Sequence, residues 1–98
     1  MALGVVEAVK AENADILVVG VDGIGEAYDS IRDGGLDATV DSFPYYMAQV
    51  ATEVTLRALA GQKIPSVVAT PQALIDSTNV DKDAADIIGW TDASYVAK

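Results

Sequence analysis

Apolar side chains recur at helical spacing in four parts of the chain, and each part ends close to a residue that stops helices. The four stretches cover residues 3–9, 24–31, 47–58 and 83–88. They are followed, in order, by Asn13, the pair Gly34-Gly35, Gly61 and Gly89. Glycine and asparagine accept the left-handed conformation that commonly ends a helix. The third stretch, which begins after Pro44, predicts the longest helix.

Short runs between these stretches have the composition of strands. Ile16–Gly20 is continuously apolar and predicts a buried strand, whereas Leu36–Val40 alternates apolar and polar residues and predicts a strand with one polar face. The β-branched run Ser66–Ala69 predicts a third strand, and Ala73–Ile75 a further short extended piece. This order of elements predicts the α/β class, with a mostly parallel sheet flanked by helices.

Composition narrows the range of functions. The chain has 98 residues, half of them apolar, which is enough for one small domain or part of a larger one. Its formal net charge of -9 argues against nucleic acid or an anionic membrane surface as a partner. It contains no cysteine and no histidine, so thiol chemistry and the commonest general base are missing. These features favour solute binding over catalysis, and we expect no enzyme activity, cofactor or metal.

The segment Val19–Gly23 is the first candidate site. Its glycines allow a sharp turn, so that Asp22 is presented at the carboxyl end of a strand, where open α/β sheets bind ligands. The next strand is followed by Asp41 and Ser42, and the two strand ends together predict a small-molecule pocket. A carboxylate can accept two hydroxyl hydrogen bonds, as from neighbouring hydroxyls of a sugar. Alternatively, Asp22 caps the helix that starts at Ile24.

Other candidate residues lie further along the chain, each with a structural alternative. Ser42 is either a ligand contact or a cap for the helix after Pro44. Phe43 and the two tyrosines after Pro44 either stack on a sugar ring or anchor the long helix to the sheet. Trp90 is expected to be a packing anchor for the tail, or to be exposed if the tail is disordered. The aspartates of residues 81–86 lack the glycine and glutamate of a calcium loop, so they predict no metal site.

Several short runs resemble the C-terminal portion of ribose-type periplasmic sugar-binding proteins of ABC importers. They are Met1-Ala-Leu-Gly4, Val19-Gly-Val-Asp-Gly23, Gly35-Leu-Asp-Ala-Thr-Val40, Phe43-Pro44, Ala60-Gly61 with Ile64-Pro65, and Thr78-Asn79-Val80. The resemblance extends over residues 1–82. It implies an incomplete part of a two-lobe fold, in which a sugar is trapped between α/β lobes that crossover segments join.

The resemblance also implies a role for individual residues and segments. Asp22 is then the carboxylate that accepts sugar hydroxyls, and Ser42 stands where many family members carry a hydroxyl-binding glutamine. Phe43 belongs to the same ligand-binding set. The implied division of the chain is residues 1–41 for a portion of the C-terminal lobe, 42–70 for a portion of the N-terminal lobe, 71–82 for a return crossover, and 83–98 for a polar tail.

The function implied is the capture of a sugar or polyol for ABC-type import by a protein of which this chain is a fragment. The partners are then the sugar or polyol and a membrane permease, and the parent protein is periplasmic or extracytoplasmic. The chain shows no signal peptide, and we expect it not to bind sugar on its own. Open edges at Ile16–Gly20 and Ser66–Ala69 predict self-association.

Two alternatives remain open beside an importer component. One is an effector-binding domain fragment of a LacI-type, sugar-responsive transcription regulator, which shares the implied fold. The other is a fragment of an α/β enzyme. An enzyme of that kind needs a nucleophile with a base beside it, and the sequence has neither histidine nor cysteine for such a pair.

Overall fold

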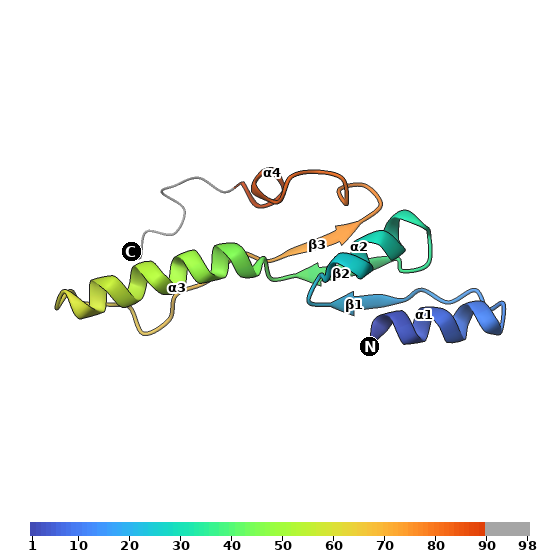
Figure 1. Ribbon diagram of the computed structural model, residues 1–98, viewed down its shortest axis with the longest axis horizontal. Coiled ribbons are helices and arrows are strands. Elements are labelled where there is room, and N and C mark those ends of the chain that lie inside the picture. The colour runs from blue at the N-terminus through green and yellow to red at the C-terminus, as the bar shows by residue number, and fades with distance from the viewer. Residues whose placement is uncertain (90–98) are drawn as a thin grey trace.

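The computed structural model describes residues 1–89 and shows an α/β arrangement drawn out along one direction (Figure 1). The elements are, in order, α1 (Ala2–Ala11), β1 (Val19–Val21), α2 (Gly25–Arg32), β2 (Ala38–Asp41), α3 (Pro44–Leu59), β3 (Ala73–Asp76) and α4 (Ala84–Ile88). The α/β class expected from the sequence is confirmed. Trp90 and the rest of the tail lie outside the described residues.

The helices form where apolar spacing predicts them. α3 is the longest, at 16 residues, and Pro44 occupies its first turn, where its missing N–H costs no helical hydrogen bond. α2 ends at Arg32, and Gly34 follows with φ +79°, a left-handed conformation that glycine adopts without strain. α4 ends in the same way at Gly89, with φ +62°.

The sheet has three strands in the order β1-β2-β3 and is mixed. β1 runs parallel to β2, with Val21 opposite Val40, whereas β3 runs antiparallel to β2. The expected strand at Ser66–Ala69 is wrong, because that run forms no strand and β3 is built from the next extended piece. α3 carries the chain away from the sheet, so Ser66–Ala69 has no strand to pair with, while Ala73–Asp76 lies beside the free edge of β2 (Figure 1).

The hydrophobic core lies on one face of the sheet. α1 and α2 cover this face, and α4 packs at its margin. Leu36 and Ile75 are its most deeply buried large side chains. On the other face Val19 and Val21 remain 60% and 70% exposed. β1 is therefore buried on one face and not on both, because no layer of helices covers the second face within residues 1–89.

α3 and residues 60–72 form an arm that projects from the body of the molecule (Figure 1). The molecule measures 58 × 23 × 16 Å, with a radius of gyration of 17.1 Å. A compact domain of this length has a radius of gyration of about 13 Å. Along α3 only Val50 is fully buried, and Leu59 at its far end is 80% exposed. The arm is thus held to the body only at its base.

Candidate functional site

The ends of β1 and β2 lie side by side and bring the two predicted strand-end segments together. Because the strands are parallel and in register, both carboxyl ends reach the same edge of the sheet. The backbone N–H of Asp22 donates to the carbonyl of Val40 at 2.8 Å, which continues the ladder beyond the last residue of β1. The Asp22-Gly23 turn therefore lies beside Asp41.

Asp22 is presented to solvent at this edge. Its backbone adopts φ +88°, an unusual conformation for a residue other than glycine. Within residues 1–89 its carboxylate accepts no hydrogen bond, and α2 begins with no side-chain cap. The helix-cap alternative for Asp22 is therefore not found. A strained residue with a free carboxylate at a strand end is a common feature of binding sites.

Asp41 lies at the strand end where the sequence places it, but sequence reasoning missed its structural role. It is only 6% exposed, and both of its carboxylate oxygens accept a hydrogen bond at 2.7 Å, one from the Tyr28 hydroxyl and one from the backbone N–H of Phe43. Gly23, with φ +62°, packs so closely on it that a Cβ there would lie 2.5 Å from the Asp41 Cγ. Asp41 thus fixes the turn after β1, the start of α3 and one side chain of α2.

The expected polar face of β2 is buried. Thr39 is completely buried, and within residues 1–89 its hydroxyl has no hydrogen-bond partner. It lies opposite Gly20 and Ile75 in the neighbouring strands, beneath the helices. The strand with one polar face is therefore found, and Thr39 and Asp41 on that face are buried.

The environment of Tyr28 has an electrostatic consequence. Burial raises the pKa of the Tyr28 hydroxyl, and the hydrogen bond to Asp41 and the charge of that carboxylate raise it further. The guanidinium of Arg32, 6.0 Å from the centre of the tyrosine ring, acts in the opposite direction. The hydroxyl therefore stays protonated and keeps donating to Asp41 over the physiological pH range.

Ser42 and Phe43 lie between this network and the arm. Ser42 is half-buried, and α3 begins without a side-chain cap, so the capping alternative for Ser42 is not found. Phe43 adopts φ +47° and is 4% exposed in the hydrophobic core. Its ring meets that of Tyr46 edge to face, with 6.5 Å between the ring centres. This packing matches the anchoring alternative for Phe43, and its contact with a ligand stays a prediction.

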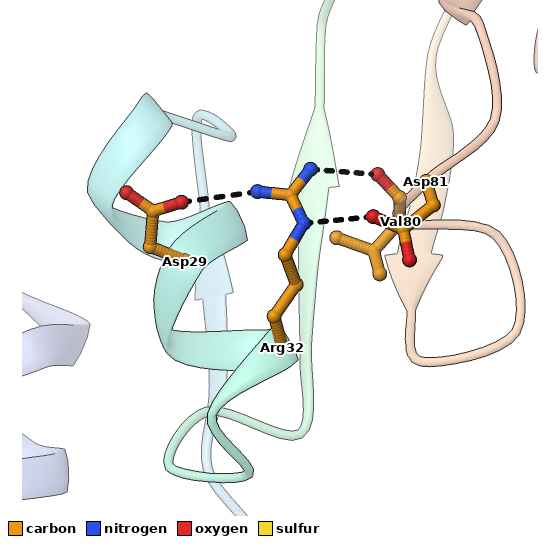
Figure 2. Close-up of polar contacts among 4 residues, drawn as sticks. All are labelled: Asp29, Arg32, Val80 and Asp81. Carbon is orange, nitrogen blue, oxygen red and sulfur yellow. Dashed lines mark hydrogen bonds and ion pairs between the residues drawn. The ribbon is translucent and has the colours of Figure 1, made fainter.

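A second polar cluster ties α2 to the turn after β3 (Figure 2). The Arg32 guanidinium donates to the carboxylates of Asp81, at 2.8 Å, and Asp29, at 3.0 Å, and to the carbonyl of Val80 at 3.3 Å. The hydrogen bond and charge of Asp81, with a smaller contribution from Asp29, raise the pKa of Arg32, although desolvation opposes them. The cluster occupies a surface separate from Asp22, so its contribution is to hold the turn in place.

A groove of about 550 Å³ runs along the outer side of β1. It is lined by Met1, Ala2, Val5, residues 17–22 and Ile24. The groove is mainly apolar, and Asp22 lies at one end of it. Within residues 1–89 no cluster of acidic side chains is placed to hold a metal ion, and no helix has the length and apolar character needed to cross a membrane.

Comparison with known proteins identifies the class to which this fold belongs. A family model described as a periplasmic binding protein domain matches residues 1–63. The chain therefore belongs to the periplasmic binding protein family, as the sequence resemblance implies. The chain is also 40% identical over 74 residues to the ribose import binding protein of Bacillus subtilis, an alignment that covers 76% of this chain and 24% of that protein.

Other relatives and solved structures agree with this assignment. The ribose import binding protein of Salmonella typhimurium is 37% identical over 65 residues, covering 65% of this chain and 22% of its own length. An ABC transporter solute-binding protein from Actinobacillus succinogenes, solved with D-allose, has a TM-score of 0.75 at 31% identity and covers 81% of this chain and 28% of its own. A Caulobacter myo-inositol binding protein has a TM-score of 0.71 at 32% identity, and the match covers 90% of this chain and 30% of that protein. The chain spans about a quarter of the length of the curated relatives it matches.

Proposed function

We propose that this chain is part of a solute-binding protein that captures a sugar or polyol for ABC-type import, with Asp22 as a carboxylate that accepts ligand hydroxyls. The observation that carries the proposal is the exposed, unpaired Asp22 at the strand end, held in a strained turn that Asp41 supports from below. The names and titles of three relatives mention ribose, D-allose and myo-inositol. They support a ligand rich in hydroxyl groups for this chain. The proposal includes no catalytic step.

The proposal also covers how the chain is divided and where it acts. Residues 1–41 contribute to one lobe, 42–70 to the other, 71–82 return to the first, and 83–98 form a tail. The projecting arm supports this division, since α3 leaves the body of the molecule directly after β2. The partners are a sugar or polyol and a membrane permease, outside the cytoplasm. Asp22 faces solvent, and within residues 1–89 no second lobe lies opposite it to enclose a ligand. We therefore expect the chain to bind sugar only as part of a protein that has both lobes.

A chimera tests the proposal. The matched 74-residue segment of the Bacillus subtilis ribose import binding protein is replaced by its counterpart here, and binding of ribose, allose and myo-inositol is measured by calorimetry. We expect one of these ligands to bind the chimera, and Asp22→Asn to weaken binding by at least about tenfold, because hydrogen bonds to a charged group contribute about 1.5–3 kcal/mol each. Asp33→Asn, at an exposed carboxylate beyond the other end of α2, is the matched control.

Each part of the proposal has its own contrary outcome. If Asp22→Asn and Asp33→Asn leave the affinity equally unchanged, Asp22 is not a ligand contact. If a folded chimera binds none of the three ligands, the proposed ligand class is wrong. Sugar binding by the isolated chain would refute only the claim that the site needs a second lobe. Ser42→Ala and Phe43→Leu in the same chimera test the two other predicted contacts.

A further inference from the structure

Tyr28 packs against the hydrophobic core on the helix side of the strand-end site. Its hydroxyl donates to Oδ2 of Asp41 at 2.7 Å. The same oxygen lies 2.7 Å from the position that a Cβ at Gly23 would take. One carboxylate oxygen therefore lies between the Tyr28 hydroxyl and the backbone of the turn that carries Asp22. Through this oxygen, α2 is connected to the proposed ligand carboxylate.

Tyr28 is itself held in place by its surroundings. Its ring packs against the hydrophobic core, and the Arg32 guanidinium lies 6.0 Å from the ring centre. The carboxylates of Asp29 and Asp81 in turn fix the position of Arg32 (Figure 2). The Tyr28 hydroxyl is therefore a donor in a fixed place, and it determines where Oδ2 of Asp41 lies.

Asp22 depends on support from its neighbours, because its own backbone conformation is unfavourable. A φ of +88° in a residue other than glycine persists only where surrounding groups hold it. Two contacts hold this turn. The Asp22 N–H donates to the Val40 carbonyl at 2.8 Å, and Gly23 packs on Asp41. The first contact fixes the backbone before the Asp22 side chain and the second fixes the backbone after it, so both set the direction of the carboxylate.

We propose that Tyr28 is a positioning residue for ligand binding: its hydroxyl, acting through Asp41, sets the direction in which the Asp22 carboxylate meets the ligand. Tyr28 itself makes no contact with the ligand. The inference rests on the proposed function, in which Asp22 accepts hydroxyl hydrogen bonds. Side chains that bind a ligand need partners that lock their geometry, and here the partner lies one residue further from the ligand than Asp41 does.

The substitution Tyr28→Phe removes the hydroxyl and keeps the ring. Oδ2 of Asp41 then loses its donor, and because Asp41 is only 6% exposed, water has little access to replace it. The carboxylate must turn toward solvent to be hydrated. Asp22 is exposed and Gly23 is half-buried, so the turn that they form is the part of the site that the carboxylate displaces.

NMR spectroscopy of this chain measures the conformation of the turn without any ligand. In Tyr28→Phe we expect the amide resonances of Asp22 and Gly23 to shift, and the coupling between the Asp22 amide and Hα protons, which reports φ, to change. Ser30→Ala is the matched control, because it removes a different side-chain hydrogen bond of α2, the one from the Leu36 N–H at 3.1 Å. We expect this control to leave the turn resonances in place. Equal shifts in the two variants, or none in Tyr28→Phe, would overturn the proposal.

The effect on affinity is measured by calorimetry in the chimera described above, with ribose, allose and myo-inositol. We expect Tyr28→Phe to weaken binding by at least about threefold, and by less than Asp22→Asn does, because it displaces the carboxylate without removing its charge. Ser30→Ala should leave the affinity unchanged. When Asp22→Asn is already present, adding Tyr28→Phe should have a clearly smaller effect, since the contact that Tyr28 positions is already weakened.

The outcomes separate this inference from the proposed function. If Tyr28→Phe leaves the affinity unchanged, or weakens binding equally with and without Asp22→Asn, Tyr28 does not act through Asp22 and the inference is wrong. If the unsubstituted chimera binds none of the three ligands, the proposed function fails, and the NMR comparison with Ser30→Ala still decides whether Tyr28 sets the turn.

Discussion

The contact between Gly23 and Asp41 provides a sharp test of how the strand-end site is held together. In Gly23→Ala the new residue must keep φ +62°, which costs an L-residue about 1–2 kcal/mol. Its Cβ would also lie 2.5 Å from the Asp41 Cγ, so the carboxylate must move. Asp41 is buried and holds two hydrogen bonds, and leaving one of their partners unpaired costs about 1–3 kcal/mol more.

Gly34→Ala is the matched control for this substitution. Gly34 has φ +79°, but no atom lies within 4 Å of the position that its Cβ would take. Urea unfolding followed by circular dichroism should therefore show a loss of stability in both variants, larger for Gly23→Ala by about 1–3 kcal/mol. In a thermal melt, each kcal/mol corresponds to about 4–8 °C for a chain of this size. Equal losses would refute the reasoning, since Asp41 would then yield to the Cβ without breaking its hydrogen bonds.

Three further predictions concern single side chains. The pKa of Tyr28 is raised, so the contribution of its hydroxyl to the unfolding free energy should be constant below the ordinary tyrosine pKa of about 10 and fall above it. Tyr28→Phe should therefore flatten the loss of stability in urea titrations at alkaline pH. Hydrogen bonds from the Thr78 hydroxyl and backbone N–H lower the pKa of Asp76, so the stabilising effect of the ionised Asp76 carboxylate is lost as the pH falls through the lowered pKa. Thr78→Val should raise the pKa of Asp76 in a carboxyl NMR titration. Arg32→Gln should speed hydrogen exchange at the Val80 amide, which Lys10→Gln should leave unchanged.

The helices and the meeting of the two strand ends follow from local rules. The spacing of apolar residues and the glycines that end the helices define α2 and α3. Two parallel strands must place their carboxyl ends at the same edge of the sheet. The identity of the third strand does not follow from such rules. Ser66–Ala69 has the better strand composition, yet Ala73–Asp76 forms β3, because pairing depends on which segment reaches the free edge of β2.

The candidate site, too, could be predicted from the sequence only in part. The exposed position of Asp22 could be predicted, because glycines and a strand end are visible in the sequence. The role of Asp41 could not, because its partners Tyr28 and Phe43 are set by how α2 lies over β2 and by the left-handed turn before α3. Polar residues that alternate in a strand predict two faces, but the packing of the helices decides which face is buried.

The register of β2 and β3 has a mechanical consequence for the arm. Because Asp41 lies opposite Ala73, the chain enters and leaves the arm through two neighbouring segments joined by the sheet. Two such segments side by side can flex together in one direction, but they resist rotation about their common axis. The pairing of Asp41 with Ala73 therefore opposes rotation of the arm relative to the sheet. Asp41, bonded to both Phe43 and Tyr28, lies at this junction and links the start of α3 to α2.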